Sequence, residues 1–147
     1  MINEIKELYK NHLEKNITEL ELYINQNDIW TIAPGIINSA GNLTLHIVGN
    51  LNLFIGANLN NTGYLRNRDA EFSLKDIPKA KLIAMLQSTK QMIDKCLSEM
   101  DNTDLGKMYP TDKFGEGRTT TYVLVYLLAH LDYHLGQINY HRRLLNK

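Results

Sequence analysis

Two histidines stand one helical turn apart in the segment LLAHLDYHLGQI, residues 127–138. Residues four apart lie about 40° apart around a helix, so His130 and His134 can direct ring nitrogens at one point. A divalent metal ion can bridge this H-x3-H spacing. Two buried histidines with ordinary hydrogen-bond partners would have the same spacing, and both interpretations stay open for the pair alone. The protease motif H-E-x-x-H is absent, because Leu131 follows His130.

A third histidine strengthens the metal interpretation. His46 shares a predicted helix face with Leu43, Leu53 and Ala57, which should point inward. Helical bundles build metal sites in their cores from residues on facing helices. Three imidazoles with an open position are typical of catalytic rather than structural zinc sites. The predicted metal ligands are His46, His130 and His134.

Several polar residues are candidates for the surroundings of this site. Asn50 follows His46 by one turn, and Gln137 follows His134 closely; each is either a partner of the site or an interhelical hydrogen-bonding residue. Three further residues belong to a polar loop and either line a pocket or form salt bridges within the loop: Arg66, Arg68 and Glu71. His141 lies about 10 Å of helix rise beyond His134, too far to share an ion, and is expected near the carbonyls at the helix end.

The elements that must position these residues are four amphipathic helices. Apolar residues recur at helical spacing over about 2–25, from a cap at Ser39 or Asn42 to about 58, from a cap at Asp76 to about 100, and over 119–145. Polar stretches between the second, third and fourth helices predict long connections, at least one of which can cross over. The 147 residues therefore predict one all-α domain, a four-helix bundle spanning residues 1–147.

Composition excludes several classes of function. The 16 basic and 16 acidic residues balance, which argues against a nucleic-acid partner. No apolar run approaches the roughly 18 residues of a membrane span, and the charged N-terminal segment does not resemble a signal peptide. A cytoplasmic protein without membrane partners is expected. The single cysteine, Cys96, falls among apolar positions and is expected to be a core thiol.

Three segments together resemble a known superfamily. The stretches NSAGNLTLHIVGNLNLFI (38–55), RNRDAEF (66–72) and LLAHLDYHLGQI (127–138) are similar to the DinB-like superfamily, especially to bacterial members with the pattern N-S-x-G-N-L-x-L-H-x-x-G-N. The similarity extends from about Trp30 to Arg143. It implies a four-helix bundle, often homodimeric, with one divalent metal held by three histidines. Carried over to this chain, these are His46, His130 and His134.

The resemblance also implies a type of chemistry. Its characterised members include thiol-dependent transferases and isomerases that use bacillithiol, mycothiol or glutathione, with the metal activating the thiol. Leu135 stands where many members carry Arg; if that Arg binds an anionic co-substrate, this chain uses a different one. Zinc or nickel ranks first as the metal, and iron or manganese also suits imidazole ligands.

Three functions remain open at this point. The first is a metal-dependent enzyme that activates a small thiol or water for transfer or hydrolysis. The second is a non-catalytic metal-binding module, related to stress and dimeric. The third is a helical scaffold in which the histidines are core residues satisfied by hydrogen bonds.

Overall fold

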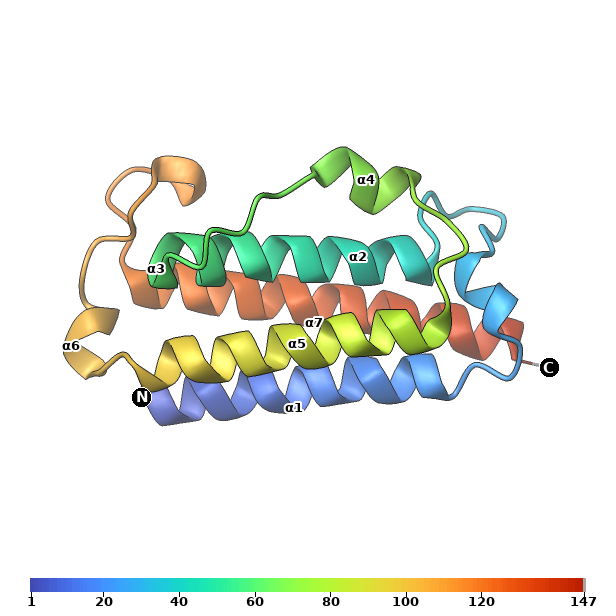
Figure 1. Ribbon diagram of the computed structural model, residues 1–147, viewed down its shortest axis with the longest axis horizontal. Coiled ribbons are helices and arrows are strands. Elements are labelled where there is room, and N and C mark those ends of the chain that lie inside the picture. The colour runs from blue at the N-terminus through green and yellow to red at the C-terminus, as the bar shows by residue number, and fades with distance from the viewer. Residues whose placement is uncertain (147) are drawn as a thin grey trace.

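Four long helices form the protein, whose structure is a computed structural model that describes residues 1–146. Their bounds are Ile2–Glu21 (α1), Ala40–Leu51 (α2), Lys79–Ser98 (α5) and Thr120–Leu145 (α7). In Figure 1, α1 and α7 run in one direction and α2 and α5 in the other. Both α1 and α2 pack against α5 and α7. The predicted all-α bundle is confirmed, and residues 1–146 contain no β-strand.

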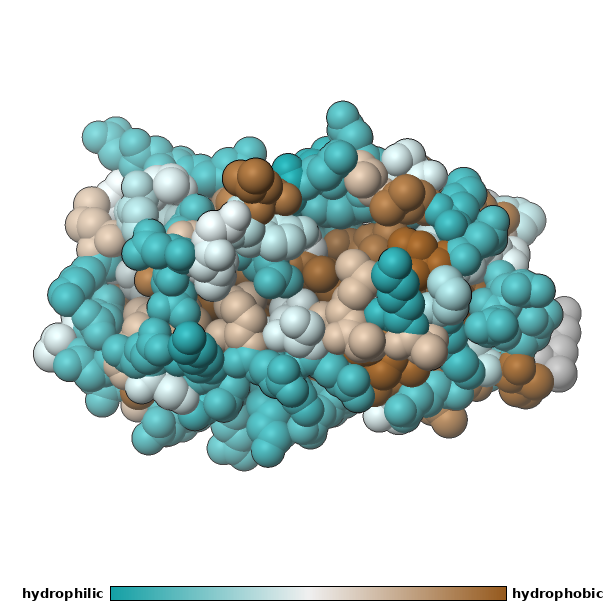
Figure 2. Space-filling model, in the orientation of Figure 1, coloured by the Kyte–Doolittle hydropathy of each residue, from teal (hydrophilic) through white to brown (hydrophobic). Residues whose placement is uncertain are grey.

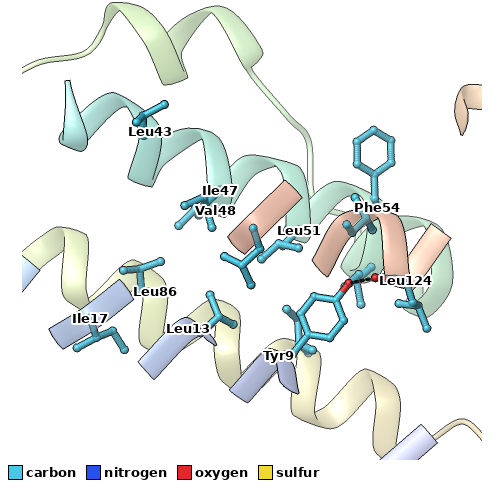
Figure 3. Packing of buried hydrophobic residues seen from close by; sticks show 14 of the residues in the cluster. Tyr9, Leu13, Ile17, Leu43, Ile47, Val48, Leu51, Phe54, Leu86 and Leu124 are labelled. Carbon is cyan, nitrogen blue, oxygen red and sulfur yellow. Dashed lines mark hydrogen bonds between the residues drawn. The ribbon is translucent and has the colours of Figure 1, made fainter. Parts of the chain in front are cut away.

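The core lies where the four helices meet. Figure 3 shows Leu13, Leu51 and Leu86 converging from α1, α2 and α5. Tyr9 is fully buried, and its hydroxyl donates to the Leu124 carbonyl oxygen over 2.6 Å, which ties α1 to α7. On the face seen in Figure 2, hydrophilic residues cover α1, and apolar residues reach the surface between α4 and α5. Burial of the shared apolar faces is the main stabilising contribution in such a bundle.

The helix that carries His46 continues beyond α2. Its N-cap is Ser39, one of the two predicted candidates. The Ser39 hydroxyl accepts a hydrogen bond from the Asn42 backbone amide. A π-helical stretch, Asn52–Ala57 (η2), and the short helix α3, Asn58–Asn60, follow directly, so that the three segments form one continuous helix. The extended helix therefore ends close to the predicted residue 58.

Two connections are long, and the one from α3 to α5 crosses over. It runs from one end of the bundle to the other and contains a short helix, α4 (Arg68–Ser73), which lies over α2 (Figure 1). The predicted cap at Asp76 is wrong, because Asp76 has a φ of 60° and α5 begins only after Pro78. A residue before proline disfavours helical geometry, and Ile77 therefore delays the helix start.

The remaining elements are short. The first helix ends at Glu21 rather than at the predicted Asn25, since the Asn25 side chain caps the 3-10 helix Gln26–Trp30 (η1) instead. The α5–α7 connection contains α6 (Asn102–Leu105) and the 3-10 helix Asp112–Phe114 (η3). In the described part of the chain, no helix combines the length and apolarity that crossing a membrane requires.

Candidate metal centre

The structure brings the three predicted histidines together. His46 projects from α2, and His130 and His134 project from α7, which lies beside α2 in the opposite direction. The Nε2 atom of His130 lies 3.3 Å from Nε2 of His46 and 3.0 Å from Nε2 of His134. One nitrogen from each ring falls within 4.8 Å of the other two. His46 is buried, whereas His130 and His134 are each partly exposed to solvent.

The hydrogen bonds made by the Nδ1 atoms of His46 and His134 determine which nitrogen of each ring carries the proton. Nδ1 of His46 lies 3.0 Å from a Glu71 carboxylate oxygen, and Nδ1 of His134 lies 2.7 Å from the Gln137 carbonyl oxygen. Both oxygens are acceptors, so both Nδ1 atoms donate. The Nε2 atoms of His46 and His134 consequently present lone pairs toward His130.

The histidines of α7 are held in the neutral form that binds metal. Burial lowers the pKa of His130 to about 4, and the neighbouring histidines and Arg66 add to this effect. Burial also lowers the pKa of His134, although its hydrogen bond to Gln137 opposes the shift. Neutral imidazoles with free Nε2 lone pairs are the metal-binding state of histidine.

The spacing of the nitrogens suits a metal ion. Zinc–nitrogen bonds of about 2.0–2.1 Å at tetrahedral angles put two ligand nitrogens roughly 3.4 Å apart. The contacts of 3.3 and 3.0 Å are close to that separation. If His130 carries its proton on Nε2, it can donate to the Nε2 lone pair of His46 or to that of His134, but not to both. The cluster therefore can hold a divalent ion, and its donor chemistry fits one.

Glu71 and Arg66 form a buried pair behind His46. The Arg66 guanidinium donates from Nε to Oε2 of Glu71 and from an Nη atom to Oε1, both over 2.8 Å. Burial alone would raise the pKa of Glu71, but hydrogen bonds from Arg66 and His46 lower it overall. The ionised carboxylate therefore accepts from both residues and fixes the orientation of the His46 ring.

Two residues of α2 allow this arrangement; Gly49 was not singled out from the sequence, and Asn42 was considered only as a helix cap. A Cβ atom on Gly49 would lie 1.9 Å from the Glu71 carboxylate, so only glycine lets the carboxylate approach the helix this closely. The buried Asn42 amide donates to the carbonyl oxygens of Glu71 and Leu74, each over 2.9 Å, and holds the end of α4 on α2. Gly and Asn are poor helix formers, and their presence inside an apolar helix could have indicated that another segment packs closely against it.

Comparison with known proteins places the chain in a family. The family profile described as "Protein of unknown function (DUF1572)" matches residues 1–147. The chain belongs to the DUF1572 family. The DUF1572 match includes the three histidines and the whole α4 connection. No curated protein and no solved structure matched the chain.

The other predicted neighbours of the site in this DUF1572 protein lie at different distances from it. Gln137 contacts His134 directly. Arg68 does not reach the cluster; its guanidinium lies 5.1 Å from the Phe72 ring centre, and the Phe72 ring packs on His46. Asn50 is buried one turn beyond His46, and its Oδ1 atom has no hydrogen-bond partner among residues 1–146.

His141 lies near the end of α7, as expected, but its hydrogen-bond partners belong to other segments and not to the carbonyls at the helix end. It is buried, its Nε2 donates to the Thr31 carbonyl oxygen over 2.8 Å, and its Nδ1 accepts from the Tyr23 hydroxyl. Both partners are more than 100 residues away in sequence, and helix periodicity contains no information about them. His141 is a structural histidine that ties α7 to the chain following α1.

Proposed function

We propose that this protein binds one divalent metal ion through His46, His130 and His134, and that it activates a small thiol or a water molecule for transfer or hydrolysis. The observation that carries the proposal is the convergence of three Nε2 atoms from two helices. The partial exposure of the two α7 histidines is consistent with an ion that solvent or a further ligand can reach. Three protein ligands and an open position characterise catalytic metal sites.

The side chains around the cluster prepare it for this role. A divalent ion held there would act as a Lewis acid that lowers the pKa of a thiol or of water. Glu71 and Gln137 hold the protons of His46 and His134 away from the ion. Arg66 offsets the charge of Glu71, so that no unpaired carboxylate remains beside the three neutral ligands.

The structure favours a thiol over water as the nucleophile. Glu71 is the acidic residue placed next to the cluster, and both of its oxygens are engaged by Arg66 and His46. It is therefore not free to take a proton from water, as a hydrolase of the metalloprotease kind requires. A thiol needs less help, because its pKa already lies near 8.5 before any activation.

The resemblance to the DinB-like superfamily supports the same assignment. Its metal is held by three histidines at corresponding motif positions, and thiol-dependent transferases occur among its members. Zinc or nickel is the proposed ion, with iron and manganese as alternatives that imidazole also accepts. The competing function is a non-catalytic metal-binding module, which would leave no exchangeable position at the ion.

We also propose that two copies of the chain associate through α7. One face of this 26-residue helix exposes a row of apolar side chains: Tyr122, Val125, Tyr126, Tyr133 and Tyr140. Arg118 and Arg143 stack on the rings at its two ends, Tyr122 and Tyr140. The middle of the row is uncharged, so two copies can meet there without repulsion between like charges. A two-fold contact between identical faces is the commonest arrangement of homodimers.

A spectroscopic titration tests the enzymatic part of the proposal. Protein loaded with Co²⁺ should develop a new near-ultraviolet absorption band when a small thiol such as 2-mercaptoethanol is added, because a sulfur ligand then occupies the open position. The His46→Ala variant, which lacks one ligand, is the control. A cobalt spectrum that does not respond to any small thiol would favour the non-catalytic module.

A further inference from the structure

The side-chain oxygen of Asn50 is a buried acceptor that no group of the protein satisfies. Asn50 is 8% exposed, and its Oδ1 atom has no hydrogen-bond partner among residues 1–146. A buried acceptor without a partner costs free energy that an apolar side chain of similar shape would not cost. The sequence left an interhelical hydrogen bond and a role at the metal site open for this residue. The described part of the chain supplies no interhelical bond to Oδ1, which leaves the role at the site.

Asn50 lies beside His46 on the inner side of α2. Residues four apart are neighbours on a helix, with Cβ atoms about 6 Å apart, and helical side chains lean toward the preceding turn. The Asn50 amide therefore leans toward the turn that carries His46. Gly49 faces Glu71, and Asn50 is turned from Gly49 by about 100°, toward the fully buried Ile47. Glu71 thus holds His46 Nδ1 from the side covered by α4, whereas Asn50 lies toward the bundle interior, where Nε2 meets α7.

Arg66 connects the two side chains that flank Asn50 on the helix. His46 lies one turn before Asn50, and Phe54 lies about one turn after it. An Nη atom of Arg66 is 3.3 Å from His46 Nδ1, and the guanidinium carbon is 5.8 Å from the Phe54 ring centre. Arg66 therefore spans the stretch of helix that carries Asn50.

Aromatic rings connect the same stretch with α7. The ring centres of Phe54 and Phe114 are 4.8 Å apart, and those of Phe114 and Tyr126 are 5.3 Å apart. Tyr126 precedes His130 by one helical turn, and His130 Nε2 lies 3.3 Å from His46 Nε2. The contacts thus form a closed series that begins and ends at the proposed metal ligands. A molecule that binds at the ion and extends toward Phe54 would pass the unpartnered amide.

The chemistry of the free oxygen defines which group it can bind. An amide oxygen accepts hydrogen bonds, so it needs an O–H or N–H donor. The reacting thiol cannot supply this donor, because it loses its own proton on activation. Glu71 cannot compete for the donor, since Arg66 and His46 engage both of its oxygens. The matching ligand is therefore a thiol that carries a second, protonated group.

We propose that Asn50 is a substrate-binding residue that selects thiols with a hydroxyl or N–H group close to the sulfur. The sulfur would bind beside the three histidines, and the donor group would form the hydrogen bond that Asn50 Oδ1 lacks. This inference rests on the proposed function, since it concerns the thiol that the metal centre would activate. It adds a selectivity that ligation of the sulfur alone does not provide.

Two thiols that differ in one group test this role. 2-Mercaptoethanol and 1-propanethiol have chains of equal length that end in a hydroxyl and a methyl group, respectively, and the absorption of Co²⁺-loaded protein gives a dissociation constant for each. In Asn50→Ala, the ratio of the constant for 2-mercaptoethanol to that for 1-propanethiol should rise about 2- to 10-fold, the usual effect of losing one neutral hydrogen bond. Asn50→Asp keeps an acceptor at the same position and should not show this rise.

Asn16→Ala is the matched control. Asn16 is also a buried asparagine whose Oδ1 has no partner within residues 1–146, but it lies on α1, which packs on α5 and α7. A ratio that stays unchanged in Asn50→Ala, or that rises equally in Asn16→Ala, would overturn the role of Asn50 and leave the metal site intact. If Co²⁺ does not bind, or if its spectrum responds to neither thiol, the proposed function fails and the role of Asn50 fails with it.

Discussion

His46 Nδ1 lies 3.0 Å from Glu71 Oε1, and this contact joins the histidine cluster to the crossover connection between α3 and α5. The carboxylate is buried and held from the other side by Arg66. A single side chain thus sets both the proton position and the orientation of one proposed metal ligand. The geometry of the cluster depends on how α4 packs on α2.

Replacement of this carboxylate should weaken metal binding. Glu71→Gln keeps the shape but removes the charge that favours the Nδ1–H form of His46, and metal affinity should fall about 10- to 100-fold, as for other residues behind a ligand. Competition with a chromophoric chelator measures the affinity. Asp69→Asn is the control, since Asp69 is exposed on the same short helix. An equal affinity for the two variants would contradict the role of Glu71.

Two glycine substitutions should have opposite effects on stability. Alanine at a helical glycine usually stabilises by about 0.5–1 kcal/mol, and Gly136→Ala should do so, since nothing lies within 4 Å of its added Cβ. Gly49→Ala should instead destabilise by about 1–3 kcal/mol, because the Cβ would overlap the Glu71 carboxylate. Urea unfolding measures both. Stabilisation by Gly49→Ala would show that α4 does not pack on α2 as described.

Acid should destabilise the metal-free protein before most carboxylates titrate. The folded pKa of His130 is about 4, below its ordinary value of 6.5, so the unfolded chain binds more protons in this range. The free energy of unfolding should therefore fall as the pH decreases from about 6.5 toward 4. Glu71 acts in the same direction only below its ordinary pKa of 4.5, because its folded pKa is lowered.

Urea unfolding in the presence of a chelator, at pH 7, 6 and 5, measures this dependence. His130→Gln should show a smaller loss of stability between pH 6.5 and 5 than the unaltered protein. An unfolding free energy that stays constant or rises as the pH decreases would contradict the neutral, buried state assigned to the α7 histidines.

Cys96 should be unreactive in the folded protein. The thiol is buried, and burial, aided by Glu99, raises its pKa to about 11. Only about 0.1% of such a thiol is ionised at pH 8, so alkylation by iodoacetamide should be at least about 100-fold slower than in urea-unfolded protein. Mass spectrometry gives the rate at the single cysteine. Rapid labelling of native protein would contradict a core position for this residue.

The exposed face of α7 should determine the oligomeric state. Light scattering is expected to give the mass of a dimer for the unaltered protein and of a monomer for Val125→Glu combined with Tyr133→Glu, because four charges would then meet in a two-fold contact. Leu8→Glu, at an exposed position of α1, is the control and should remain dimeric. A monomeric unaltered protein would refute the proposed association.

Local patterns in the sequence were sufficient for the helices and the histidine cluster. Apolar periodicity indicated the four helices, and it also placed His46 on an inward face toward the α7 pair. The same patterns could not place residues whose position depends on contacts between distant segments. His141 is fixed by Tyr23 and by the Thr31 carbonyl, and its position follows only from the folded chain.

The crossover connection was the least predictable part. The sequence showed that Arg66 and Glu71 belong to a polar loop, and it left a pocket role and a salt bridge open as alternatives. The structure shows the salt bridge, and it also shows that this pair contacts His46. The close approach depends on Gly49 and Asn42, whose contacts with α4 are tertiary and leave no periodic signal.

The metal content of purified, untagged protein tests the central claim most directly. Elemental analysis should find about one equivalent of a divalent transition metal in the unaltered protein, as three histidine ligands from one chain imply. The same result is expected for the control variant His12→Ala, which removes a histidine outside the cluster. Metal should be absent when His46, His130 and His134 are all replaced by Ala. Protein that carries no metal, even after incubation with zinc or nickel salts, would contradict the account.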